Sequence, residues 1–175
     1  MRRILVFAIT LFICTGLNYA KKPDVDLSFL KKQNQLNCII DFSNVTLNNT
    51  APEGDFYHDV FVAQFEEWKK KLNEDEMYYQ KRFFSGVINE FESRRMAFGN
   101  IPSAEYTVRV LIDKTTANGD IDATFVFSHT ATEEEICKFQ LHGGGGKFGS
   151  MMNLVGDGMR ELGENFGKLL RKKSK

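Results

Sequence analysis

The chain has 175 residues, of which 42% are hydrophobic and 26% are charged, a composition typical of a globular protein with a buried core. Basic and acidic side chains are equal in number, 23 of each, so the formal net charge is zero. A balanced charge gives no electrostatic reason to bind the phosphate backbone of a nucleic acid. We therefore expect no nucleic-acid partner.

Residues 1–20 have the order of a secretory signal peptide. Basic residues at positions 2 and 3 precede an apolar run at positions 4–13, and small residues follow up to Ala20. The run is shorter than the roughly 20 apolar residues that a helix needs to cross a bilayer. We expect an exported protein, periplasmic or outer-membrane-associated, whose mature chain begins near Lys21.

Cys14 lies within the apolar run of this signal. Phe12 and Ile13 precede it, whereas acylation of a leading cysteine normally requires a small residue just before it. We therefore expect simple cleavage without lipidation. Loss of the two arginines in the signal leaves the mature chain with a net charge of about −2.

The mature chain divides into a polar lead-in over 21–35 and a single domain over 36–175. Strict alternation of apolar and polar residues from Leu36 predicts a strand. Apolar residues at helical spacing predict a helix over 59–72, and a capping-box pattern at Asn73 predicts that a second helix starts there.

Three further strands are expected near 106–112, 121–127 and 136–141, because apolar and polar residues alternate in each and the connections are short. A final helix is expected over 150–172. The order β-α-α-β-β-β-α predicts an α+β fold of two layers, a mainly antiparallel four-stranded sheet with helices on one face.

The final helix contains glycines, each of which costs about 1 kcal/mol relative to alanine in a helix interior. Gly156, Gly163 and Gly167 lie on one side, beside an apolar stripe, which predicts close packing against a sheet or a bulky aromatic side chain. Gly158 lies on another arc, and we expect it to tolerate alanine. The alternative is a membrane-surface helix, which the acidic residues of its polar face disfavour.

The glycine run at 143–146, followed by Lys147, lacks the spacing of a phosphate-binding loop. Leu141 stands where the first glycine would be required, and Phe148 replaces the hydroxyl residue. We interpret the run as a connector, with an anion-binding nest of backbone amides as the alternative.

Cys38 and Cys137 are the cysteines that remain after cleavage. An oxidising compartment permits a disulfide between them. Both also lie among apolar residues in expected strands, and free cysteines are common in protein cores. The sequence leaves both possibilities open.

No residue pattern in the chain indicates a catalytic, cofactor-binding or metal-binding site. The three histidines, His58, His129 and His142, do not combine with other ligands at a defensible spacing. The densest polar and aromatic group is Asp55, Phe56, Tyr57, His58 and Asp59. We take this group as a candidate interaction loop, with a solvated loop leading into a helix as the alternative.

Two segments resemble a known group of proteins, CIIDFS at 38–43 and GKFGSMMNLVGDGM at 146–159. With the order of elements, they look like uncharacterised exported proteins of Gram-negative gut and oral anaerobes. More distantly, the chain is similar to the small α+β domain of envelope components such as the N-terminal domain of TolB. The resemblance implies an envelope location and a two-layer fold, and it brings no active-site residues.

The sequence thus favours a non-catalytic exported envelope protein that acts as a binding or assembly module. Its expected partner is another envelope protein or a small ligand, and no cofactor is expected. The alternative is a secreted or periplasmic hydrolase with a site near residues 55–59, which would require acidic groups to converge in the folded chain.

Overall fold

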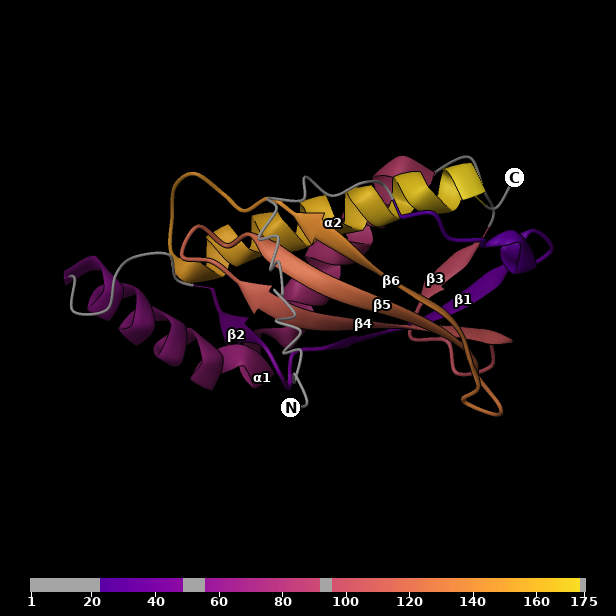
Figure 1. Ribbon diagram of the computed structural model, residues 1–175, viewed down its shortest axis with the longest axis horizontal. Coiled ribbons are helices and arrows are strands. Elements are labelled where there is room, and N and C mark those ends of the chain that lie inside the picture. The colour runs from indigo at the N-terminus through magenta and orange to yellow at the C-terminus, as the bar shows by residue number, and fades with distance from the viewer. Residues whose placement is uncertain (1–22, 49–55, 92–95, 174–175) are drawn as a thin grey trace, which may run out of the picture.

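A computed structural model describes residues 23–48, 56–91 and 96–173 of the chain (Figure 1). The expected signal peptide therefore lies outside the described residues. In chain order the elements are η1 (Ser28–Leu30), β1 (Gln35–Asp41), β2 (Thr46–Leu47), α1 (Phe56–Phe91), β3 (Ala97–Gly99), β4 (Tyr106–Thr115), β5 (Ile121–His129), β6 (Glu135–Gly143) and α2 (Met151–Lys173). The fold is α+β, as predicted.

The sheet has six strands, in the order β3-β1-β4-β5-β6, with β2 paired to β4 beyond the end of β1. The strands β4, β5 and β6 form the expected antiparallel meander. In contrast, β1 pairs in parallel with both β3 and β4, and β2 also pairs in parallel with β4. The prediction of a mainly antiparallel four-stranded sheet is therefore wrong: the sheet is mixed, and β2 and β3 are too short for alternation to reveal.

Both helices pack on the same face of this sheet. Phe125 of β5 is fully buried, and its ring contacts Phe83 of α1 at 6.2 Å and Phe166 of α2 at 4.7 Å between centroids. Along β5, buried Ile121, Ala123, Phe125 and Phe127 alternate with side chains that keep some exposure. This alternation is the signature of a sheet with one face on the core and the other open.

The helix α1 is one continuous element, although its ribbon changes direction along its length (Figure 1). The indole Nε1 of Trp68 donates a hydrogen bond of 2.7 Å to the Tyr79 hydroxyl. In a straight helix these residues would be about 16 Å apart along the axis. The bend brings both side chains into the core, where Tyr79 is fully buried.

The predicted break at Asn73 is therefore wrong. The capping-box pattern at Asn73 and Glu76 does not start a new helix, because neither residue prevents helical hydrogen bonding through that turn. The apolar side chains on both sides, Leu72 and Tyr79, remain buried in a single core. Tertiary packing thus overrides a local capping signal, as it commonly does.

Replacing Tyr79 with phenylalanine should destabilise the protein by about 1–3 kcal/mol, because the buried Trp68 N–H loses its acceptor. Urea denaturation of the mature protein would measure the loss. The matched control is Tyr57→Phe, at a ring that is 63% exposed. Equal stability of Tyr79→Phe and the unsubstituted protein would show that the hydrogen bond contributes nothing to the free energy of unfolding.

The helix α2 packs against α1 along its glycines. A Cβ atom on Gly163 would overlap the carbonyl oxygen of Phe83, and one on Gly167 would lie 2.8 Å from the carbonyl oxygen of Val87. Gly86 of α1 is equally close to the backbone of α2, at Arg160. Gly86, Gly163 and Gly167 therefore face a helix backbone rather than the sheet or an aromatic ring, and one of the three glycines predicted to pack closely is an exception.

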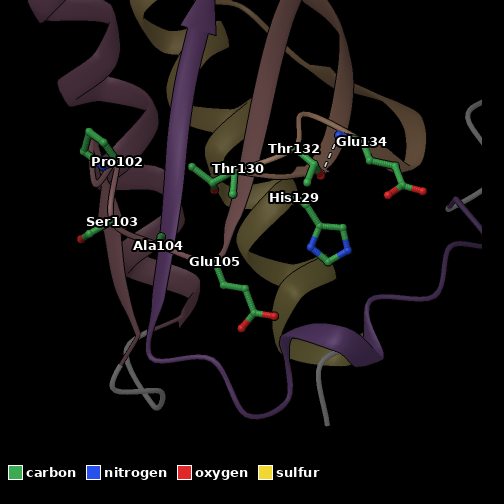
Figure 2. Close-up of a pocket in the computed structure, with 9 residues that line it drawn as sticks. Pro102, Ser103, Ala104, Glu105, His129, Thr130, Thr132 and Glu134 are labelled. Atoms are coloured by element: carbon green, nitrogen blue, oxygen red, sulfur yellow. Dashed lines mark hydrogen bonds between the residues drawn. The ribbon is translucent and has the colours of Figure 1, made fainter.

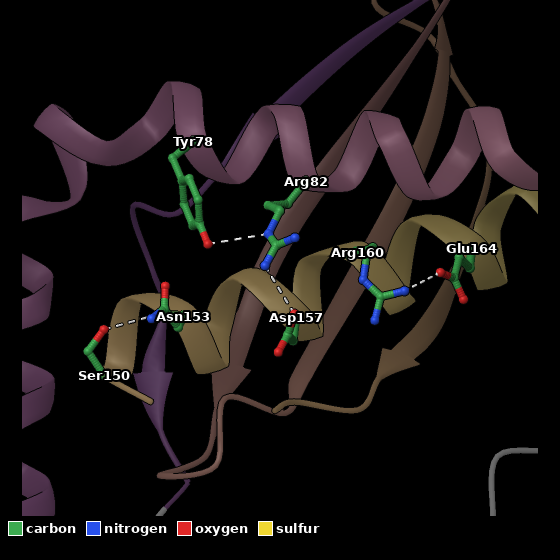
Figure 3. A network of polar contacts seen from close by, with 7 residues as sticks. All are labelled: Tyr78, Arg82, Ser150, Asn153, Asp157, Arg160 and Glu164. Atoms are coloured by element: carbon green, nitrogen blue, oxygen red, sulfur yellow. Dashed lines mark hydrogen bonds and ion pairs between the residues drawn. The ribbon is translucent and has the colours of Figure 1, made fainter. Parts of the chain in front are cut away.

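Gly156 is that exception, since a Cβ there would lie 2.6 Å from the Tyr78 hydroxyl, at the end of a side chain that can move. Around it, the Arg82 guanidinium bridges the helices by an ion pair of 3.1 Å with Asp157 (Figure 3). The same guanidinium lies over the Tyr78 ring, 5.5 Å from its centroid. The helices α1 and α2 are thus joined in two ways, by close approach of their backbones at glycines and by the partly exposed contacts of Arg82 with Asp157 and Tyr78.

The packing around Gly158 contradicts the expectation that this position tolerates alanine. A Cβ there would overlap the carbonyl oxygen of Gly119, in the turn between β4 and β5. Its arc of α2 is away from α1 but faces the end of the sheet. The expectation was wrong because a helix wheel shows which residues share a face, and says nothing of how many faces are covered.

Candidate functional site

The structure has a shallow hollow of about 600 Å³ at one end of the sheet, between the connection before β4 and the turn after β5 (Figure 2). These segments meet because β4 and β5 are antiparallel neighbours, and the Thr130 N–H donates a 2.9 Å hydrogen bond to the Glu105 carbonyl oxygen. The lining residues are Pro102, Ser103, Ala104, Glu105, His129, Thr130, Ala131, Thr132 and Glu134.

A buried polar network supports one wall of this hollow. The Asn37 side chain donates to the Thr107 hydroxyl at 3.0 Å and accepts from the Ile101 N–H at 2.8 Å. The hydroxyls of Thr107 and Thr130 are 2.9 Å apart. Asn37 is 4% exposed and uses both ends of its amide within the protein. The network therefore holds the segments at Ile101 and Thr130 in place, and both the amide nitrogen and the amide oxygen of Asn37 are already hydrogen-bonded within the protein.

The ionisable side chains of the hollow do not converge. The carboxylates of Glu105 and Glu134 lie on different sides of His129 and point apart (Figure 2). The Glu105 carboxylate accepts a 2.8 Å hydrogen bond from the Gln33 amide, and its hydrogen bond with Tyr106 raises the pKa of that phenol. A general acid–base pair requires two groups within reach of one substrate atom, and this arrangement does not provide it.

The candidate interaction loop is not a loop in its described part. Phe56, Tyr57, His58 and Asp59 form the first turns of α1, and Asp55 lies outside the described residues. The rings of Phe56 and Tyr57 are 75% and 63% exposed and contact each other. None of the four described residues lines the hollow.

One polar pair was not predicted from the sequence. His142 of β6 and Asp122 of β5 are cross-strand partners, with Nδ1 and Oδ1 2.9 Å apart and both side chains about half exposed. Pairing across strands has no local sequence signal, because it depends on register. Within the described ranges, no group of three or more His, Cys, Asp and Glu side chains is placed to hold a metal ion.

The glycine run at 143–146 lies among carboxylates. The Gly145 N–H donates a 2.8 Å hydrogen bond to Asp120, and the Glu161 and Asp157 carboxylates lie beside Gly144 and Gly146. An anion in this loop would meet three negative side chains. These surroundings favour the connector interpretation over an anion-binding nest.

Cys38 and Cys137 are both free. They lie in one row across the sheet, through Val108 of β4 and Phe127 of β5. At about 4.8 Å for each strand, their Cα atoms are about 14 Å apart, twice the separation that a disulfide allows. A disulfide between them is therefore ruled out in this fold. The sequence left it open because it does not show that three strand spacings separate the two cysteines.

Burial raises the pKa of Cys137 to about 11 and also raises the pKa of the fully enclosed Cys38. At pH 8 the Cys137 thiolate should therefore be about 100-fold scarcer than that of an unperturbed cysteine. We expect iodoacetamide to label neither thiol rapidly in the native protein and both after unfolding. Rapid labelling of native Cys137, read by peptide mass spectrometry, would contradict the buried environment.

The second face of the sheet, which we call the open face, carries no helix from residues 23–48, 56–91 or 96–173. Its central row runs Ile39, Arg109, Val126 and Lys138 across four strands, and the next row runs Asp41, Leu111, Thr124 and Gln140. Ile39 is 40% exposed, and Ile136 of β6 is 37% exposed. The open face thus combines aliphatic side chains with charges of both signs.

The apolar stripe of α2 is used within the core. Val155, Met159, Leu162 and Phe166 are completely buried. A helix lying on a membrane would need this stripe to be free, so the membrane-surface alternative for α2 does not fit the fold. No helix in the described ranges is both long and apolar enough to cross a membrane.

No protein-family model matches the chain, and no curated protein matches it. Solved structures with a similar arrangement include the following three. The PelC dodecamer of Paraburkholderia phytofirmans has 5% identity, covers 76% of this chain and 88% of its own, and gives a TM-score of 0.38. A Xanthomonas campestris protein of family DUF330 has 10% sequence identity. The match covers 78% of this chain and 82% of that protein, with a TM-score of 0.39.

A substituted PelC dodecamer from the same Paraburkholderia species has 10% identity, covers 86% of this chain and 94% of its own, and gives a TM-score of 0.34. Scores and identities this low transfer no function, because unrelated functions share common folds. The similarity to the TolB domain is not shown by these comparisons.

Proposed function

We propose that this protein is an exported, non-catalytic module of the cell envelope that acts by binding or assembly. The observation that supports this most directly is the open face, where aliphatic side chains remain exposed over several strands. A surface that mixes half-exposed aliphatic side chains with charged ones has the composition of a protein–protein interface rather than of a catalytic cleft. The hollow beside His129, whose carboxylates diverge, supplies no comparable support for the hydrolase alternative.

Export is the first part of the proposal, and it rests on the signal pattern of residues 1–20. We expect the intact mass of the protein from the envelope fraction to match a chain beginning near Lys21 without a lipid. A membrane-retained species acylated at Cys14 would contradict simple cleavage. A full-length species in the cytoplasm would contradict export.

Binding through the open face is the second part. A photoreactive amino acid at Gln140, exposed on the open face, should give discrete cross-linked products in intact cells. The matched position is Ser85, exposed on α1, which should give none. Products at Ser85 only, or at neither position, would overturn the proposed function. The mass of a product at Gln140 would identify its partner.

A further inference from the structure

The charges of the open face are separated along the strands. Arg109 of β4 and Lys138 of β6 lie in the row with Val126 of β5. Further along, past Leu111, Asp113 accepts a 2.7 Å hydrogen bond from the Thr124 hydroxyl, and Asp122 pairs with His142. One end of the face is therefore cationic, and the other end is rich in carboxylates.

We propose that this face binds a second copy of the chain, face to face, about a two-fold axis that crosses the strands at Leu111. Rotation about that axis reverses the strand direction, so the Arg109 end of one copy meets the Asp113 end of the other. Each contact occurs twice by symmetry. Leu111 then lies on the axis, in the middle of the interface, where burial from water is greatest, and Val126 lies one row away from it.

The remaining charges favour an identical partner over a strongly charged one. Lys114, opposite Asp122 in the same sheet, adds one positive charge to the carboxylate end. Hydrogen bonds from Ser43 lower the pKa of the Asp41 carboxyl, and the charge of nearby Arg109 lowers it further. Cations and carboxylates thus balance over the face, which offers little to an anionic membrane or a nucleic acid. A second copy, turned about this axis, presents Asp113 to Arg109 and Arg109 to Asp113.

The size of the face sets the expected strength. Four strands of about nine residues cover about 600 Å², below the roughly 800 Å² that each partner contributes to a standard interface. We therefore expect a weak dimer with a dissociation constant in the micromolar range. Because the opposed charges of Arg109 and Asp113 stay partly accessible to solvent, salt screens them, and dimerisation should weaken as ionic strength rises.

Sedimentation-velocity ultracentrifugation of the mature protein tests the proposal. Measurements over about 1–100 µM protein, at low and high salt, cover the range in which a micromolar dissociation constant would show monomer and dimer. Arg109→Asp and Asp113→Arg should each raise the dissociation constant at least 10-fold, and the double substitution should restore most of the affinity. Lys70→Asp, on the exposed surface of α1, is the control and should change nothing.

Asp113→Arg also removes the hydrogen bond to Thr124, so circular dichroism must confirm its fold. Lys138→Glu, at an exposed position of β6, provides a second charge reversal without that complication. A monomer at every concentration, or a dimer that neither charge reversal affects, would overturn the proposal. The inference does not depend on the proposed envelope function, since a monomer that still cross-links to another protein through Gln140 would leave that function intact.

Discussion

Replacing Phe166 with alanine should destabilise the protein by about 4 kcal/mol, one of the largest losses that a single substitution in this fold can produce. The Phe166 side chain on α2 is completely buried. Its ring contacts those of Phe83 on α1, Phe98 on β3, and Phe125 and Phe127 on β5, with centroids 4.7–6.2 Å apart. One side chain thus joins both helices to the centre and the edge of the sheet.

Urea denaturation followed by circular dichroism would measure this loss. Phe166→Leu keeps most of the apolar volume and should cost about 1.5 kcal/mol or less. Phe148→Ala is the surface control, since that ring is 90% exposed, and its effect should stay within about 0.5 kcal/mol. If Phe166→Ala were no more damaging than Phe148→Ala, the aromatic cluster would not be the centre of the core.

The parts of the fold that the sequence predicted are those with local signals. The meander from β4 to β6 was recognised because alternation is long and the connecting turns are short. The last helix was expected over 150–172 and spans Met151–Lys173, because its apolar stripe repeats without interruption. Such signals depend only on neighbours in the chain.

The parts that were missed depend on pairing between distant segments. Alternation from Leu36 indicated a strand but not that β1 lies in parallel beside β4, about 70 positions later. The same limit explains the disulfide, since Cys38 and Cys137 share a face but lie three strands apart. Register and strand order are properties of the whole sheet.

The candidate site shows the same division. The group at 55–59 was chosen because its residues are adjacent in sequence, yet its described members form helical turns. The hollow beside His129 joins the connection at Glu105 to the turn at Thr130, and the open face joins four strands. Each was invisible to a search for motifs.

Alanine at Gly86 or Gly163 should destabilise the protein by about 2–3 kcal/mol, although alanine is the better helix former by about 1 kcal/mol. A methyl group at Gly163 would overlap the carbonyl oxygen of Phe83, and one at Gly86 would overlap that of Arg160. In both cases the obstacle is backbone, so a side-chain rotation cannot relieve it. The two helices must move apart, and the aromatic core beneath them loosens.

Three further variants separate close packing from helix weakness. Ser85→Ala, next to Gly86 but exposed, should be neutral or stabilise the protein by a few tenths of a kcal/mol, about what helix propensity supplies. Gly156→Ala should cost less than Gly163→Ala, because the Tyr78 side chain can turn away. The double substitution Gly86→Ala with Gly163→Ala should cost less than the sum of the single effects, since one separation of the helices accommodates both methyl groups. Thermal melts that showed stabilisation at Gly86, Gly163 and Ser85 alike would mean that α1 and α2 do not approach so closely.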